Sequence, residues 1–293
     1  MENRAIFSGK ALAYLLVLPQ LAISLIFFYW PAVQAVWQSF LVQDAFGLST
    51  EFVWLENYVA LLQQPGYYQA IGVTFLFSAL VVFFSMSLGL LLAVMANQNI
   101  RGVQIYRTFL IIPYAVAPAV ASVLFIFMFQ PGLGMIARFL QRSGIDWNPV
   151  LNGTHAMILI VIVAVWNQIS YNFLFFLAGL QSIPKSVIEA AAIDGARPMR
   201  RFWTIIFPLL SPTTFFLIVV NITYAFFNTL GIIDTATGGG PNGATATLVY
   251  KVFLDGKAGS DLGGSAAQSV ILMIIVVLLT AIQFRYVEKK VHY

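Results

Sequence analysis

Six long apolar stretches alternate with short polar segments along the 293 residues of this chain. One helical crossing of a bilayer core needs about 20 predominantly apolar residues. Lipid offers the backbone no hydrogen bonds, so each crossing must be a helix that satisfies its own polar groups. The predicted spans are Leu12–Val36, Ile71–Ala96, Phe109–Phe129, Ala156–Leu180, Phe207–Gly231 and Ala267–Phe284. The pattern therefore predicts an all-α integral membrane protein, with six transmembrane helices in a single domain over residues 1–293.

The spans differ in ways that predict how they pack. The second carries small residues at four-residue spacing, Ser85, Gly89 and Ala93, which favours close contact with another helix. Prolines in the third and fifth spans should loosen those helices, and such breaks tend to face protein or a water-filled cavity. They are Pro113, Pro118, Pro208 and Pro212. The first span is too long, and ends too rich in Trp and Pro, for a cleaved signal peptide, so we expect an uncleaved anchor.

The cations predict the orientation of the chain. Membrane proteins concentrate Lys and Arg in their cytoplasmic loops. One side of the predicted topology holds eleven of the fifteen cations, namely Arg4, Lys10, Arg101, Arg107, Lys185, Arg197, Arg200, Arg201, Arg285, Lys289 and Lys290. The other side has Arg138, Arg142, Lys251 and Lys257. We therefore expect a multi-pass membrane protein with both termini, and the loop that contains Glu189, in the cytoplasm.

The composition excludes several classes of function. Hydrophobic residues make up 60% of the chain and charged residues 9%, unlike a soluble domain. The net charge is +4, but the Lys and Arg residues lie at the margins of the predicted spans. Membrane topology therefore explains the charge better than nucleic-acid binding does. There is no cysteine, and the two histidines, His155 and His292, have no metal-ligand spacing, so we expect no metal site. Because no span contains Asp, Glu, His, Lys or Arg, a proton-coupled carrier and an intramembrane enzyme are both disfavoured.

Uncharged polar residues inside two spans are a second functional signal. Residues three and four apart share one face of a helix. Each of the fourth and fifth spans has such a face, and the two sets are Gln168, Tyr171 and Asn172, and Asn221, Tyr224 and Asn228. Amides and phenols can bind the hydroxyls of a sugar or polyol, and they can equally hold helices together. The sequence leaves both readings open.

A polar loop, residues 184–208, separates these two spans. Pro184 can open a short helix, and Gly195 can end it because glycine accepts a left-handed backbone. A second helix should begin near Pro198. The three alanines from Ala190 to Ala192 keep the first helix narrow, so another protein could approach it closely. The alternative is a helical hairpin that simply lies on the membrane surface.

The order Glu189-Ala190-Ala191, Gly195, Ile205 and Phe207-Pro208 resembles the conserved cytoplasmic loop of permease subunits of bacterial ATP-binding-cassette (ABC) importers. Phe207 stands where the family usually has Leu. Further stretches resemble the carbohydrate permeases of this family, and most of all the first permease subunit of sn-glycerol-3-phosphate importers. They begin at Pro113, Trp166, Val219 and Ser265.

The resemblance implies a type I importer permease in the bacterial inner membrane and a set of partners. These are a second permease subunit, two ATPase subunits that carry ATP and Mg, and a periplasmic binding protein. This chain itself would have no cofactor, no catalytic residue and no enzymatic activity. The implied ATPase contacts are Glu189, Ala190, Ala191, Asp194, Gly195 and Arg197, and the outer loop residues expected to meet the binding protein are Gly239, Gly240 and Asn242.

The implied cargo is sn-glycerol 3-phosphate, together with related glycerophosphodiesters. The substrate-pathway residues would be Gln168, Tyr171, Asn172, Asn221, Tyr224 and Asn228. No span offers a cation to meet a phosphate, which leaves a neutral sugar or oligosaccharide as the alternative cargo. An ion-coupled secondary transporter is the remaining alternative class.

Overall fold

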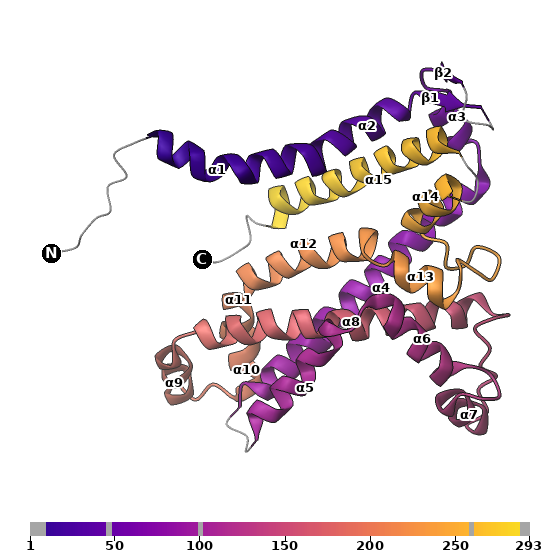
Figure 1. Cartoon of the computed structure of the whole chain (residues 1–293). Coiled ribbons are helices and arrows are strands. Elements are labelled where there is room, and N and C mark those ends of the chain that lie inside the picture. The colour runs from indigo at the N-terminus through magenta and orange to yellow at the C-terminus, as the bar shows by residue number, and fades with distance from the viewer. Residues whose placement is uncertain (1–9, 45–48, 99–101, 258–260, 288–293) are drawn as a thin grey trace. The chain divides into compact units, whose positions relative to one another are not determined.

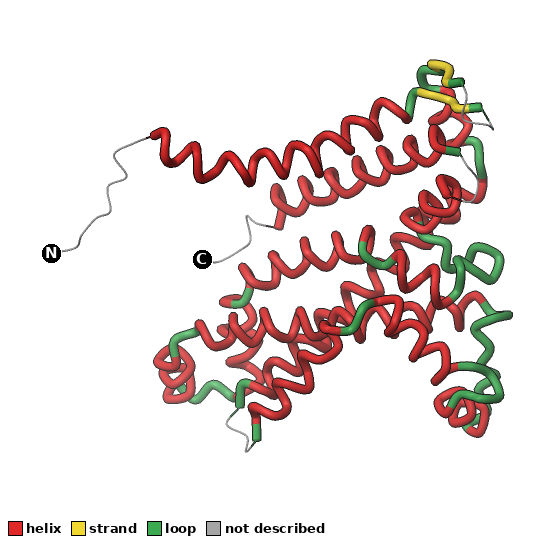
Figure 2. Tube along the Cα trace, in the orientation of Figure 1, coloured by secondary structure: helices red, strands yellow, loops and turns green. Residues whose placement is uncertain are grey.

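The computed structural model describes residues 10–44, 49–98, 102–257 and 261–287. They are almost entirely helical (Figures 1 and 2). Residues 1–63 with 252–271, and residues 64–251 with 272–293, form two compact units. The division cuts through two helices, α14 (Leu248–Lys257) and α15 (Leu262–Ile282). The prediction of a single domain over 1–293 stays a prediction.

The first unit begins with one helical run made of α1 (Lys10–Ser24), a π-helical turn η1 (Leu25–Tyr29) and α2 (Trp30–Gln38). A short hairpin follows, which the sequence analysis did not predict. Its strands β1 (Leu41–Gln43) and β2 (Thr50–Phe52) pair antiparallel, with Val42 opposite Glu51. Helix α3 (Glu56–Leu62) closes the hairpin, because Asn57 Nδ2 donates to the carbonyls of Ser39 and Leu41, both at 2.9 Å.

The second unit is built around two long helices, α4 (Pro65–Ala96) and α8 (Gly153–Ser182), which pack on one another. As expected, the small residues Ser85, Gly89 and Ala93 are buried. Gly89 is the point of closest approach, because an added Cβ would lie 2.6 Å from Asn172 Cβ. Asn152 begins α8 by accepting hydrogen bonds from the backbone of Thr154 and His155, at 2.9 and 3.3 Å.

Two of the predicted spans are sharply bent. The third consists of α5 (Val103–Ala115) and α6 (Pro118–Phe129), which meet at 102°. At the fifth, a helical stretch made of α10 (Pro198–Arg201), η2 (Phe202–Ile206) and α11 (Phe207–Leu209) begins before the predicted start at Phe207 and meets α12 (Ser211–Phe227) with a bend of 67°. Both bends lie at the predicted prolines, where the backbone loses a donor and the ring clashes with the preceding turn.

By length and composition, four described helices could cross a membrane, or six if each bent pair counts as one span. The straight ones are Tyr14–Gln38, Pro65–Ala96, Gly153–Ser182 and Leu262–Arg285. The remaining helices are short, namely α7 (Met135–Arg142), α9 (Lys185–Ile193), α13 (Leu230–Ala236) and the terminal turn η3 (Gln283–Val287). The six predicted spans therefore correspond to the helices found, with the third and fifth broken.

Candidate functional site

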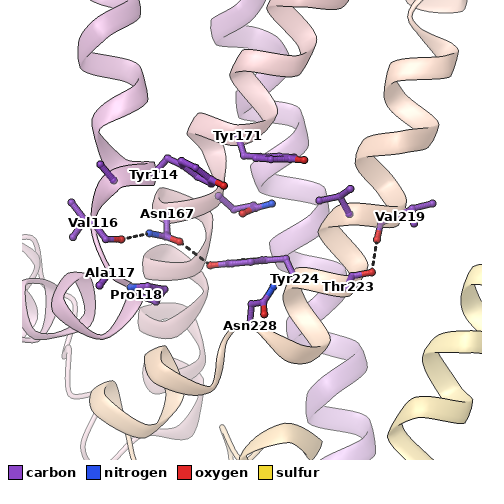
Figure 3. Close-up of a pocket in the computed structure, with 13 residues that line it drawn as sticks. Tyr114, Val116, Ala117, Pro118, Asn167, Tyr171, Val219, Thr223, Tyr224 and Asn228 are labelled. Atoms are coloured by element: carbon purple, nitrogen blue, oxygen red, sulfur yellow. Dashed lines mark hydrogen bonds between the residues drawn. The ribbon is translucent and has the colours of Figure 1, made fainter. Parts of the chain in front are cut away.

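A polar pocket of about 570 Å³ opens at the bend of the third span (Figure 3). The elbow between α5 and α6 forms one wall, α8 forms the second, and α12 forms the third. Its lining residues are Tyr114, Ala115, Val116, Ala117, Pro118, Asn167, Gln168, Tyr171, Val219, Val220, Thr223, Tyr224 and Asn228. This lining contains amides, phenols and a hydroxyl but no charged side chain.

Asn167 stabilises the elbow. Its Nδ2 donates to the carbonyls of Pro113 and Val116, at 3.2 and 3.0 Å. Those carbonyls lie where the bend interrupts the regular helical hydrogen bonds, so the amide replaces lost partners. Asn167 Oδ1 in turn accepts from the Tyr224 hydroxyl at 3.4 Å, which ties α12 to the same point (Figure 3). Asn167 lies within the predicted fourth span, but no role was predicted for it. The signal that could have found it is the pair Pro113 and Pro118 in the third span, because prolines leave backbone carbonyls without their helical donors.

Four of the six predicted pathway residues line the pocket: Gln168, Tyr171, Tyr224 and Asn228. Within the described part of the chain, the side-chain amides of Gln168 and Asn228 form no hydrogen bond, so both are free to bind a ligand. Tyr114 packs near Tyr171, with ring centroids 5.8 Å apart, and extends the aromatic wall. The pocket thus offers hydrogen-bonding groups from two helices beside flat aromatic faces, a combination suited to a hydroxylated ligand.

The other two predicted residues, Asn172 and Asn221, do not line this pocket. Both are fully buried, and their amides pair reciprocally across α8 and α12 at 2.6 and 3.0 Å. Ser85 Oγ of α4 donates to Asn221 Oδ1 at 3.1 Å, so three helices meet here. We therefore assign these two amides to helix packing. The two residues differ because Asn172, four positions after Gln168, is rotated by about 40° around the axis of α8. That rotation turns Asn172 toward Gly89 of α4.

The contrast between the two sets gives a direct test. Asn228→Ala should leave stability and assembly unchanged and weaken substrate transport about fivefold, since one hydrogen bond contributes about 1 kcal/mol. Asn221→Ala should instead lower thermal stability, because an interhelical hydrogen bond in a membrane contributes on average about 0.6 kcal/mol and Asn172 would lose its partner. Uptake and melting temperature are measured for both variants. A melting temperature that falls equally in both would argue that Asn228 is also a packing residue.

The loop of residues 184–208 has the predicted geometry. Helix α9 ends at Ile193, and Gly195 forms the turn after it with a φ of +76°. The last carbonyls of the helix accept hydrogen bonds from Gly195 N–H (to Ala192 O, 3.1 Å) and Ala196 N–H (to Ala191 O, 3.0 Å). Five of the six predicted ATPase contacts are exposed, namely Glu189, Ala190, Asp194, Gly195 and Arg197, whereas Ala191 is buried. Ile193 beside them is 87% exposed, so the loop presents a mixed apolar and charged surface.

The glycine-rich loop after α13 is folded on itself. Thr245 Oγ1 donates to the carbonyl of Gly240 at 2.8 Å, and Gly239 is buried against the ring of Tyr250. The neighbouring Asp234 and burial both raise the pKa of Tyr250, burial being the larger cause. Of the three predicted binding-protein contacts, Asn242 is exposed, Gly240 is partly exposed and Gly239 is covered.

No group of three or more His, Cys, Asp or Glu side chains gathers around a metal-sized space in the part of the chain described. His155 instead accepts a hydrogen bond from the backbone of Asn148 at 3.1 Å and stacks on Trp147, with ring centroids 4.9 Å apart. Its role in this structure is to hold the turn before α8. His292 lies outside the described residues.

Bent apolar spans around an uncharged polar pocket, with an exposed helical loop at one end, define a membrane permease. Residues 85–293 match the family described as binding-protein-dependent transport system inner membrane component. The chain belongs to this family, the permease subunits of ABC importers.

Relatives match the chain from end to end. The sn-glycerol-3-phosphate transport system permease protein UgpA of Rhizobium meliloti is 60% identical over 99% of both chains. The UgpA proteins of Agrobacterium fabrum and Brucella suis are 60% and 59% identical, over 98% and 99% of both chains. A solved bacterial ABC transporter that imports the acidic polysaccharide alginate shares the fold, with a TM-score of 0.79 over 94% of this chain and 96% of its own, at 21% identity.

Proposed function

We propose that this chain forms half of the translocation pathway for sn-glycerol 3-phosphate and related glycerophosphodiesters. The observation that carries the proposal is the end-to-end identity of 59–60% with permeases named for that substrate. At such similarity the residues that line a pocket are seldom replaced wholesale. The pocket chemistry supports the same cargo, because the free amides of Gln168 and Asn228 suit the two hydroxyls of a glycerol backbone.

The charge of the phosphate needs a separate account, since the pocket lining is uncharged. We place its recognition on the partner permease and on the periplasmic binding protein, which would release the substrate into a pathway that this chain lines only in part. The uncharged lining is also the specific observation that favours the second candidate, a neutral sugar or oligosaccharide carried by the same machinery.

The proposed partners are a second permease subunit, two ATPase subunits and the binding protein. ATP and Mg would bind the ATPase subunits, and hydrolysis would take place there. The exposed surface of α9 and of the turn that follows it, with Glu189, Asp194 and Arg197, would dock on the ATPase and transmit its closure. The exposed Asn242 would face the binding protein. Both termini would then be cytoplasmic, and labelling of a cysteine at Asn242 from outside intact cells tests this orientation.

Uptake assays test the cargo directly. Cells that lack this permease should regain uptake of radiolabelled sn-glycerol 3-phosphate when the chain is supplied together with its partner subunits. Unlabelled glycerophosphodiesters should compete, whereas maltose and similar neutral sugars in tenfold excess should not. Competition by neutral sugars, with no effect of glycerophosphodiesters, would contradict the proposal and favour the second candidate.

A further inference from the structure

Helix α7 (Met135–Arg142) has no role in the site described above. It follows the end of α6 directly and precedes α8, so it lies at the level where these membrane-spanning helices end. In Figure 1 the view is close to along α7, whereas α8 runs across it, so α7 lies crosswise to the spans. It also packs against α6, and Ala137 is fully buried in that contact. If α8 crosses the membrane along its length, a helix crosswise to it runs along the membrane plane.

The side chains of α7 fall into three sectors, because successive residues turn by about 100°. Ala137 and the half-buried Leu140 face the protein. Met135 and Phe139, one turn apart, are 70% and 68% exposed and form an apolar strip. The exposed Arg138 and Arg142, also one turn apart, form a basic strip beside it. This arrangement of protein, apolar and basic sectors is what a helix at a lipid–water boundary needs.

The two arginines stand out among the cations. They lie on the predicted outer side, where the other cations are Lys251 and Lys257. The Lys257 ammonium lies over the Phe253 ring, 4.9 Å from the ring centroid. Across residues 10–44, 49–98, 102–257 and 261–287, no carboxylate pairs with the guanidinium of Arg138 or Arg142. Val120, Leu124 and Phe127 of the neighbouring α6 are exposed as well, so both helices carry apolar side chains on their surfaces.

We propose that α7 is an interfacial anchor that binds acidic phospholipid headgroups. Met135 and Phe139 enter the boundary of the acyl chains, and Arg138 and Arg142 bind headgroup phosphates, to which guanidinium groups are geometrically matched. The anchor holds α6, the segment of the bent span beyond the elbow. Since that elbow walls the polar pocket, the shape of the pocket then depends on acidic lipid. The proposal rests on family membership and does not depend on the identity of the cargo.

Lipid contact can be measured at single positions because the chain contains no cysteine. The whole importer carrying Phe139→Cys, labelled with a fluorophore, is placed in nanodiscs that contain spin-labelled phosphatidylglycerol or spin-labelled phosphatidylcholine at equal mole fraction. Both lipids should quench Phe139→Cys, and the acidic lipid should be enriched roughly 25-fold, since each of the two arginines near an anionic surface contributes about a fivefold enrichment. The matched control is Gln141→Cys, on the water-facing side of the same helix, where quenching should be weak.

The charge requirement is tested in the same background. Arg138→Gln with Arg142→Gln should abolish the preference for phosphatidylglycerol, whereas Arg138→Lys with Arg142→Lys should retain most of it. Equal quenching by the two lipids in Phe139→Cys with both arginines intact would overturn the assignment of an acidic headgroup site. Absence of lipid quenching at Phe139→Cys, with protection by the added binding protein or the partner permease, would overturn the proposal and identify a protein interface.

Discussion

Replacing Gly89 by valine is expected to prevent α4 from packing on α8 and to remove the folded permease from the membrane. The first added carbon alone would lie 2.6 Å from Asn172 Cβ and 3.2 Å from the backbone carbon of Asn172, so the two helices would have to separate. Overpacking of this kind typically costs about 1–3 kcal/mol, and the branched side chain adds to it. Separation would also disturb the amide pair between Asn172 and Asn221.

Gly72→Val is the matched control for this prediction. Gly72 lies on the same helix, and an added Cβ there would meet nothing within 4 Å. Melting temperature, yield of the assembled importer and uptake should all fall for Gly89→Val and stay near normal for Gly72→Val. Normal yield and melting temperature for Gly89→Val would contradict the close approach of these helices.

The second large effect is expected at Gly195, in the loop proposed to contact the ATPase. Gly195→Val should leave membrane insertion and the membrane-embedded pocket intact while reducing transport at least tenfold. An added Cβ at Gly195 would meet nothing within 4 Å, so the cost comes from the backbone φ of +76° and not from a steric clash. A left-handed conformation costs an L-residue about 1–2 kcal/mol, and more for a β-branched one. The turn that orients α9 would therefore be lost.

Gly195→Asn separates the turn from any other role of the glycine, because asparagine tolerates the left-handed region. It should recover most of the transport that valine abolishes. Co-purification of the ATPase subunit with each variant supplies the second readout, and it should be weak for valine and near normal for asparagine. Full uptake by Gly195→Val would rule out a role for this turn in coupling.

The proposed cargo carries a charge and the pocket does not, so the phosphate would be recognised elsewhere in the importer. A site that moves a polyol phosphate across a membrane has to release it, and a buried cation in the pathway would hold the phosphate strongly. Weak, multiple hydrogen bonds from Gln168, Tyr171 and Asn228 would position the glycerol part without trapping it. The partner permease and the binding protein would then recognise the phosphate before the substrate enters the pocket.

The sequence by itself determined the spans and the helical loop of residues 184–208, because each depends on local chemistry. Bilayer thickness fixes the length of an apolar helix, proline removes a backbone donor wherever it occurs, and glycine is the residue that ends α9 with a left-handed turn. The family resemblance rested on the same short segments. The polar residues within the spans were also visible, because an amide in an apolar stretch stands out.

Only the tertiary structure decided which of those amides belong to the pocket. Periodicity places Gln168 and Asn172 on one face of α8, yet that face is wide enough to meet two different neighbours. Gly89 lets α4 approach on one side and buries Asn172 against Asn221, whereas the bend at Pro113 and Pro118 leaves space on the other side, beside Gln168. Which sector of a helix meets a neighbour and which meets a cavity depends on residues 49 or more positions away in the sequence, so no local pattern can specify it.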